Sequence, residues 1–292
     1  MRIARFTNEN GEGLALVNPD GSMRGIYASD VRYPGSLHDI LQRGEGGLEE
    51  AAKRLAAGDP VEATAITFLP PIAQPSKIIC VGLNYADHSA ESGYAVPDYP
   101  TVFARFASSL IGHGAPIICP RVSNQLDFEG ELVAIIGTGG RDIPLGKALD
   151  HVAGYSLFND GSIRDYQHRT PQWTVGKNFD GTGSFGPYFV SADELPAGCR
   201  GLMLTTRLNG ETVQRASTDD LIFDVATLIS LLSEAMTLEP GDIIVTGTPS
   251  GVGAARKPPL WMKAGDICEV EVEKIGKLIN GIANQGPAGV IS

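Results

Sequence analysis

A short stretch near the middle of the chain carries residues whose types and spacing could do chemistry. Asp127–Ile136 begins with acidic side chains and continues as an apolar, β-branched run, which predicts a strand that enters the core. Side chains alternate along a strand, so Glu129 and Glu131 lie on one face with only Gly130 between them. A third carboxylate, Asp160, follows another apolar run. Three carboxylates that meet at strand ends are typical of a site for a hard divalent cation, Mg²⁺ or Mn²⁺.

Spacing alone leaves a second interpretation of these carboxylates open. Glu-x-Glu pairs are common on the solvated face of exposed strands, and Asp160 could belong to an unrelated loop. Two like charges beside a buried run, in contrast, cost free energy unless a cation offsets them. The neighbouring residues must therefore decide between a metal site and a solvated strand face.

His88 and Glu91 form a second candidate group. They are three residues apart within Leu83–Ser92, and on one helical turn they would be neighbours on the same face. A carboxylate beside an imidazole fixes its tautomer and stabilises the imidazolium, as a general base requires. An exposed pair at this spacing contributes only about 0.2–0.5 kcal/mol, and taken alone the two residues favour this simpler interpretation.

Other polar residues could complete a site around the carboxylates. Arg105 lies in an expected strand, where it either binds an anionic ligand or is solvated. Arg164 and Gln167 follow Asp160 by four and seven residues, so all three would share one face of a helix. Lys177 precedes a glycine-rich loop.

That glycine-rich loop, Gly181–Gly186, matches the GxGxxG pattern of dinucleotide-binding proteins. The pattern is meaningful only between a strand and a helix, and here Pro187–Val190 is expected to continue as a strand. Gly247–Gly251 likewise lacks the lysine of a phosphate-binding loop. The chain has no HExxH motif and no GxSxG motif. We therefore expect no nucleotide cofactor.

The composition argues against several classes of protein. A net charge of −11 argues against a nucleic-acid partner and against an anionic membrane surface. No apolar run approaches the length of a membrane span, and Met1–Phe6 lacks the apolar core of a signal peptide. The four scattered cysteines form no CxxC pair, which indicates reduced thiols in a cytoplasmic protein.

Residues 1–72 are expected to form a small α/β domain. Met1–Phe6 and Leu14–Val17 alternate like the strands of a hairpin, and short helical patterns follow at Leu37–Leu41 and Leu48–Leu55. A stiff, proline-rich connection leads to the rest of the chain. This segment shows no chemistry, so we expect it to cover the larger domain or to dimerise with it.

Residues 73–292 are expected to form a second domain of the α+β class, mostly β, because 36 glycines and 19 prolines indicate many turns. Asn209-Gly210 predicts a type I′ hairpin turn. The apolar spacing of Leu221–Met236 predicts a helix, with Asp219 and Asp220 as its caps. Strands are expected at Lys77–Gly82, Pro100–Phe106, Val152–Phe158, Leu202–Leu208, Glu211–Gln214, Ile243–Val245, Asp266–Val272 and Lys277–Asn280.

Taken together, four segments resemble the fumarylacetoacetate hydrolase family, in the family's order and over about residues 77–283. The resemblance implies a mixed β-sandwich roll, a homodimer and a Mg²⁺ or Mn²⁺ site, in which Ca²⁺ can act as a crystallographic substitute. The segments are Val81–His88, Asp127–Leu132, Asn159–Gln167 and Leu238–Gly253.

The resemblance also implies roles for individual residues. Glu129, Glu131 and Asp160 match the family's metal carboxylates. His88 and Glu91 match its water-activating pair, on a segment that acts as a lid. Lys177 matches the lysine beside the metal, and Arg164, Gln167 and Thr248 match positions that bind substrate. Asp127 shares the strand face, and we expect it to be a supporting or structural residue.

One departure from the family concerns Arg105, which we expect to bind substrate. Many relatives carry Phe-x-Lys-Pro-Ser where this chain has Phe103-Ala104-Arg105-Phe106-Ala107-Ser108. The charge is kept, but the wider guanidinium and the lost proline are expected to reshape the pocket.

The implied reaction is hydrolytic C–C cleavage of a 1,3-diketo acid such as an acylpyruvate. His88, oriented by Glu91, would activate the attacking water, and Lys177 with the metal would stabilise a pyruvate enolate. The same site could decarboxylate an oxaloacetate-like acid, or isomerise or hydrate a 2-oxo-alkenoate. Because His88 and Glu91 are present, hydrolysis or hydration is favoured. A protein of another class would bind the oxo-acid through the metal without catalysis.

Overall fold

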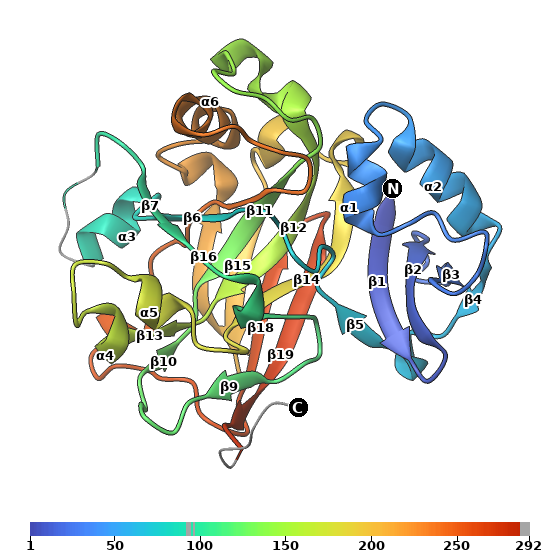
Figure 1. Ribbon diagram of the computed structural model, residues 1–292. Helices are drawn as coiled ribbons and strands as arrows, with labels where there is room; N and C mark the ends of the chain where they lie inside the picture. Colours follow the sequence, from blue (N-terminus) through green and yellow to red (C-terminus); the bar gives the residue numbers. More distant parts are fainter. Residues whose placement is uncertain (92–94, 96, 287–292) are drawn as a thin grey trace.

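The computed structural model describes residues 1–91, 95 and 97–286 (Figure 1). Its framework is a twelve-stranded mixed sheet, in which ten strands follow the order β4-β3-β2-β1-β14-β12-β11-β17-β6-β7. A five-stranded sheet packs beside it, and short helices cover the edges. The predicted α+β class with mostly β-structure is confirmed.

The N-terminal residues supply one end of the long sheet. The predicted hairpin and both short helices are present. β1 also pairs with β14, with Arg2 opposite Val190, so the sheet continues across the boundary that we place at residue 72. The elements of this part are β1 (Arg2–Asn8), β2 (Gly11–Val17), β3 (Met23–Tyr27), α1 (Leu37–Gln42), α2 (Gly47–Ala56), β4 (Asp59–Val61) and β5 (Thr67–Leu69).

In the other part of the long sheet, strands β11, β12 and β17 are nearly all buried, whereas the edge strand β7 is partly exposed. β11 runs antiparallel to both β12 and β17, with Gly130 opposite Asn159 and Val133 opposite Val245. The strands are β6 (Ile78–Gly82), β7 (Thr101–Ala104), β8 (Leu110–Ile111), β11 (Gly130–Ile136), β12 (Val152–Asp160), β14 (Gly183–Ser191) and β17 (Ile243–Val245).

The predicted single strand over Asp127–Ile136 is interrupted. Asp127 belongs to β10 (Leu126–Asp127), which pairs with β13 (Ser162–Ile163) in a separate small sheet. At the interruption, two backbone N–H groups donate to side-chain amide oxygens rather than to a neighbouring strand. Glu129 N–H donates to Asn159 Oδ1 at 3.1 Å, and Gly130 N–H donates to Gln214 Oε1 at 3.0 Å. The interruption places Glu129 just outside β11 and Glu131 inside it.

The second sheet has the order β16-β15-β18-β19-β9 and packs against β11 and β12. The predicted hairpin is confirmed, because Asn209 and Gly210 have φ angles of 52° and 82°. One apolar cluster joins Leu132 and Leu157 of the long sheet to Leu204 and Val270 of the second. The strands are β9 (Ile117–Cys119), β15 (Met203–Leu208), β16 (Glu211–Ser217), β18 (Ile267–Val272) and β19 (Gly276–Asn284).

Two helix predictions require correction. The helix predicted over Leu221–Met236 is α6 (Val225–Ala235), and its cap is Asp224, which accepts the Thr227 N–H. Asp219 and Asp220 lie instead in the 3₁₀ turn Thr218–Asp220. Asp160 does not share a helix with Arg164, because it ends β12. The remaining helices are α3 (Ala86–Glu91), α4 (Arg164–Gln167) and α5 (Thr174–Lys177), and further 3₁₀ turns lie at Ala63–Ala65, Ala107–Ser109, Leu145–His151, Ala192–Glu194, Ala197–Cys199 and Gly253–Ala255.

The glycine-rich loop behaves as predicted, because Gly183–Ser191 forms β14 rather than a nucleotide-binding helix. All four cysteines are free thiols. Within the described residues, no helix is long and apolar enough to cross a membrane.

Candidate active site

Three carboxylates converge where β11 and β12 end. Glu131 lies at the start of β11, Asp160 closes β12, and Glu129 lies between β10 and β11. All three are buried, and each offers an oxygen within 4.8 Å of those of the other two. The antiparallel pairing of β11 and β12 brings these strand ends together, so the predicted cluster is present.

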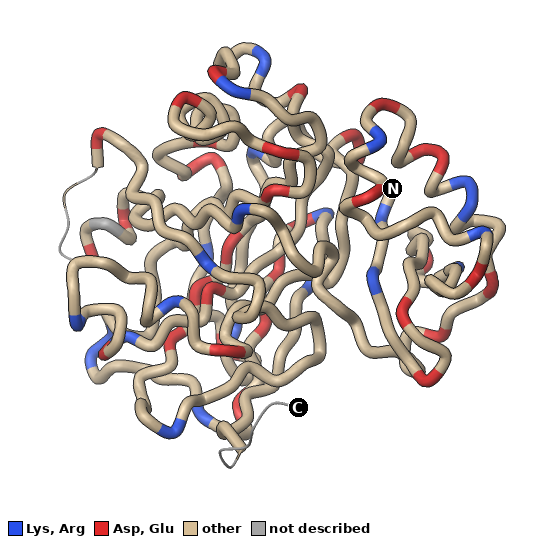
Figure 2. Tube along the Cα trace, viewed as in Figure 1, with Lys and Arg blue, Asp and Glu red and all other residues tan. Residues whose placement is uncertain are grey.

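Two cations neutralise one side of this cluster. Lys177 Nζ lies 2.6 Å from both Glu129 Oε2 and Asp160 Oδ2, and Arg164 Nη2 lies 2.6 Å from Glu129 Oε1. Burial alone would raise the pKa of Glu129, but Lys177 and Arg164 outweigh it and lower that pKa to about 2. Figure 2 shows acidic and basic residues side by side in the interior of the fold.

Glu131 has a different environment. It accepts the Gly247 N–H, but within the described part of the chain no salt bridge reaches it. Burial, followed by the charges of Asp160 and Glu129, holds its pKa well above the ordinary value. A cation among the three carboxylates would remove this repulsion. Their oxygen donors are those that Mg²⁺ and Mn²⁺ prefer, so the residues fit a divalent cation.

His88 and Glu91 form the predicted pair on α3. His88 Nδ1 lies 2.9 Å from Glu91 Oε1, and Glu91 also accepts the Gly251 N–H at 3.0 Å. Burial would raise the pKa of Glu91, but these contacts lower it. A carboxylate beside an imidazole fixes its tautomer, so the pair has the arrangement that a general base requires.

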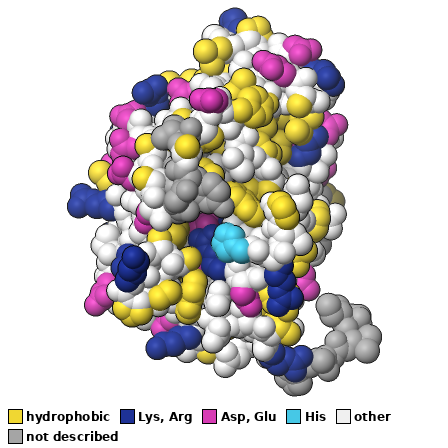
Figure 3. Space-filling view, turned by 90° about the vertical axis from the view of Figure 1, so that its left-hand side faces the viewer, with side chains coloured by type: hydrophobic (Ala, Val, Ile, Leu, Met, Phe, Trp, Pro, Cys, Tyr) yellow, Lys and Arg dark blue, Asp and Glu magenta, His cyan; other side chains and the backbone are white. Residues whose placement is uncertain are grey.

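A cavity of about 260 Å³ connects the pair with the carboxylates. Figure 3 shows it as a hollow with acidic and basic side chains inside and a histidine at its edge. Its walls include eight of the predicted residues and also Phe103, His168 and Trp173, which were not predicted as site residues. The predicted residues on its walls are His88, Glu91, Arg164, Gln167, Lys177 and Thr248, together with Glu129 and Glu131.

Arg105 does not line this cavity. Its fully buried guanidinium forms an ion pair with Asp160 and donates to Thr182 Oγ1 at 2.8 Å and to Ser109 Oγ at 3.2 Å. All of these partners are protein groups that lie behind the carboxylate cluster. The structure therefore places Arg105 in support of Asp160, rather than on the wall where we expect a substrate to bind.

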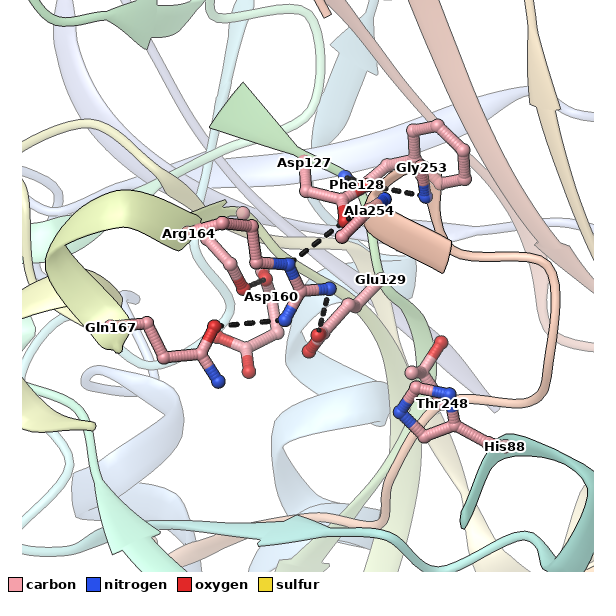
Figure 4. Close-up of polar contacts among 12 residues, drawn as sticks. His88, Asp127, Phe128, Glu129, Asp160, Arg164, Gln167, Thr248, Gly253 and Ala254 are labelled. Carbon is pink, nitrogen blue, oxygen red and sulfur yellow. Dashed lines mark hydrogen bonds and ion pairs between the residues drawn. The ribbon is translucent and has the colours of Figure 1, made fainter. Parts of the chain in front are cut away.

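Thr248 and Gln167 lie on the wall of the cavity, and each already has a hydrogen-bond partner within the protein. The Thr248 hydroxyl donates to the Gly130 carbonyl at 2.9 Å and accepts from Gln214 at 2.8 Å. Gln167 accepts from Arg164 Nη1 at 2.8 Å, which leaves its amide N–H₂ group available (Figure 4). Gln214 was missed by the sequence analysis, because a glutamine in a hairpin strand has no distinguishing pattern.

Comparison with known proteins agrees with this geometry. Residues 77–283 match the fumarylacetoacetate hydrolase C-terminal family. The chain is 39% identical to a human mitochondrial oxaloacetate tautomerase over 288 residues, which cover 97% of this chain and 91% of the relative.

Solved structures give the same result. A fumarylacetoacetate hydrolase from Exiguobacterium antarcticum is 36% identical, with a TM-score of 0.85 over 98% of this chain and 100% of that one. A maleylpyruvate hydrolase from Sphingobium sp. SYK-6, solved with manganese(II) and pyruvate, is 26% identical, with a TM-score of 0.81 and the same coverage. The chain belongs to the fumarylacetoacetate hydrolase family, whose fold it has.

Proposed function

We propose that this protein is a metal-dependent enzyme that moves a proton on a short 2-oxo dicarboxylate, interconverting the keto and enol forms of oxaloacetate. The observation that carries the proposal is a general base, His88 oriented by Glu91, in the same small cavity as a buried triad of metal-binding carboxylates. Similarity to an oxaloacetate tautomerase over almost the whole of both chains supports this substrate class.

The size and charge of the cavity support a small acid. At about 260 Å³ it lies below the roughly 300–1,000 Å³ of sites for drug-sized ligands. Arg164 and Gln167 lie on its wall, where a guanidinium and an amide can bind a carboxylate. We assign them to the carboxylate that is farther from the 2-oxo group.

A divalent cation held by Glu129, Glu131 and Asp160 would polarise the 2-oxo group as a Lewis acid. His88 Nε2 takes a proton from C3, and the C–H electron pair becomes the C2–C3 double bond. Glu91 stabilises the imidazolium that forms. The carbonyl electron pair moves to the 2-oxo oxygen, where the Lys177 ammonium stabilises the negative charge. That oxygen then takes the proton from the His88 imidazolium, which completes the enol and restores the neutral base.

Hydrolysis of an acylpyruvate is the second candidate, because the same His88–Glu91 pair can activate a water molecule. The resemblance to a maleylpyruvate hydrolase solved with manganese(II) and pyruvate supports it. Our preference for hydrolysis or hydration rested on the presence of this pair. A base in this position is equally suited to proton abstraction from carbon, so the pair alone does not separate the reactions.

The test uses the Mn²⁺-loaded protein and two substrates. With enol-oxaloacetate, we expect rapid loss of enol absorbance without release of pyruvate or CO₂, and we expect a chelator to abolish it. Acetylpyruvate cleaved to equal amounts of pyruvate and acetate would instead establish the hydrolase. Pyruvate and CO₂ from oxaloacetate would establish the decarboxylase, and tight oxalate binding without turnover would establish an oxo-acid-binding protein.

Several further properties are part of this proposal. We place the site's metal as Mg²⁺ or Mn²⁺, the protein in the cytoplasm and the assembly as a homodimer, with residues 1–72 as its small N-terminal domain. The human relative, by contrast, is mitochondrial. Light scattering of the full-length chain and of a chain that begins at residue 73 would test the assembly and the domain boundary.

A further inference from the structure

Residues 251–254 form a short backbone segment between two carboxylates that come from distant parts of the chain. The Gly251 N–H donates to both oxygens of Glu91 at 3.0 Å, and the backbone of Val252 adds to this contact. The next two N–H groups point to Asp127: Gly253 donates at 2.7 Å and Ala254 at 2.9 Å. We refer to residues 251–254 as the bridge segment.

Asp127 also binds the guanidinium that faces the cavity. Its Oδ2 accepts from Arg164 Nε at 2.8 Å, and the other nitrogens of Arg164 reach Glu129 and Gln167 (Figure 4). Asp127 is fully buried, so these hydrogen bonds form away from bulk water, where each is stronger than at the surface. One carboxylate therefore holds both Arg164 and the bridge segment.

The backbone of the bridge segment is shaped for this contact. Gly251 has a φ of +102°, which only glycine adopts readily, and a Cβ there would overlap the Val213 carbonyl. A Cβ on Gly253 would overlap the Leu260 carbonyl and would lie 2.6 Å from Asp127 Oδ1. The two glycines allow the segment to approach Asp127 closely, with its N–H groups directed at the carboxylate.

We propose that Asp127 is a positioning residue that aligns the two halves of the active site. Asp127 fixes the position of Arg164, which we assign to binding the substrate carboxylate that is farther from the 2-oxo group. Through the bridge segment, Asp127 fixes the position of the backbone N–H groups that bind Glu91. It thereby fixes the position of the His88–Glu91 pair. The assignment of the cavity as the active site rests on the proposed function, whereas the coupling between Asp127 and Glu91 does not.

Asp127→Asn tests the proposal in the full-length chain. The amide keeps one accepting oxygen, but its N–H₂ group then faces two N–H donors, either those of Ala254 and Arg164 or those of Gly253 and Phe128. Asp242→Asn is the matched control, because Asp242 is equally buried and also binds two backbone N–H groups and one cation. It lies at the end of the β11–β17 strand pair that is opposite to Glu131.

Amide hydrogen exchange reads the coupling without any assay of activity. In Asp127→Asn we expect exchange of residues 86–91 and 251–255 to become roughly 10–100-fold faster, the size expected for loss of hydrogen bonds to a charged group. Asp242→Asn should leave both segments unchanged. Faster exchange confined to Gly253 and Ala254, with α3 and Gly251 unaffected, would overturn the coupling.

Steady-state kinetics of the Mn²⁺-loaded variants test the consequence of this coupling for substrate binding and turnover. We expect Asp127→Asn to raise KM, through Arg164, and to lower kcat per folded protein, through the His88–Glu91 pair. A purely structural role would lower only the folded fraction. Unchanged KM and kcat in the folded protein would therefore overturn the positioning role, even if the exchange result held.

A second variant keeps the test available if Asp127→Asn does not fold. Glu91→Gln perturbs the bridge segment from its other end, where the side chain is half-buried. If the segment transmits position, exchange at Gly253 and Ala254 becomes faster as well as exchange at Gly251. Faster exchange at Gly251 alone would show that the two carboxylates act independently. Failure of the oxaloacetate assay would change neither exchange result.

Discussion

The two ends of the β11–β17 strand pair carry buried carboxylates in opposite situations. At one end, Asp242 accepts the N–H groups of Lys77 and Glu239 and forms an ion pair with the Lys77 ammonium at 2.9 Å. At the other end, Glu131 accepts one N–H, from Gly247, and lies beside two further carboxylates. The same strands therefore carry one carboxylate, Asp242, whose charge is offset by a lysine, and another, Glu131, that is repelled by two neighbouring carboxylates.

This difference distinguishes a buried carboxylate that stabilises the fold, Asp242, from one that could bind a metal ion, Glu131. At Asp242 a cation and two backbone N–H donors offset the buried charge and stabilise the turn. A buried carboxylate that lacks a cation raises the free energy of the metal-free protein, and a bound divalent ion would recover it. The predictions below test that contrast.

The largest effect is expected at Glu131. Glu131→Gln keeps the shape of the side chain but removes a charged metal ligand, so we expect Mn²⁺-dependent turnover to fall by roughly 1,000-fold or more. Calorimetric titration with Mn²⁺ should show a matching loss of affinity. Normal metal affinity in this variant would remove Glu131 from the metal site.

His88→Asn should reduce kcat by roughly 100- to 10,000-fold, the range typical of a lost general base. Because His88 is not one of the residues expected to bind the metal, Mn²⁺ affinity should remain at the wild-type value. Full turnover by a folded, metal-loaded His88→Asn protein would contradict the assigned base.

Arg105→Lys keeps the positive charge and tests where Arg105 acts. A lysine cannot contact Asp160, Thr182 and Ser109 together, so we expect Mn²⁺ affinity to fall by roughly 10–100-fold, as for other groups that orient a metal ligand. At saturating Mn²⁺, KM should be unchanged. A higher KM under those conditions would return Arg105 to the substrate-binding residues.

The stability of the metal-free protein should depend on pH through Glu131. Its pKa in the folded chain is raised above the ordinary 4.5, so between those two pKa values the folded state binds a proton that the unfolded state lacks. Stability from this group is complete below pH 4.5 and is lost as pH rises through the folded pKa. Relative to wild type, the Tm of Glu131→Gln should rise as the pH increases above 4.5, and Mn²⁺ should reduce this difference in Tm by stabilising the wild type.

The smallest effect on activity is expected at Asp242. Asp242→Asn removes an ion pair that is buried on the carboxylate side, so the free energy of unfolding should fall by about 1–3 kcal/mol. Values of kcat and KM should match those of the wild type, because the residue lies at the opposite end of the strands. A change in Mn²⁺ affinity would show that the two ends are coupled.

The sequence by itself determined most of the residues of the candidate site. Side-chain alternation placed Glu129 and Glu131 on one face, i,i+3 spacing paired His88 with Glu91, and four ordered segments identified the family. Glycine and proline marked the hairpins and breaks, because backbone conformation at those residues is a local property. The strands and the short helices were accordingly predicted close to their observed positions.

Only the tertiary structure decided how those residues are supported. Arg105 lies behind Asp160, and Asp127 joins Arg164 to residues 251–254. Glu131 forms no salt bridge with the part of the chain that the structure describes. The sequence could not show these arrangements, because each depends on contacts between segments far apart in the chain. The interruption before β11 and the later start of α6 arise in the same way, from Asn159, Gln214 and Asp224 supplying the hydrogen bonds. Local pattern selects a residue's type, whereas its burial and charge partners are set by packing of the whole chain.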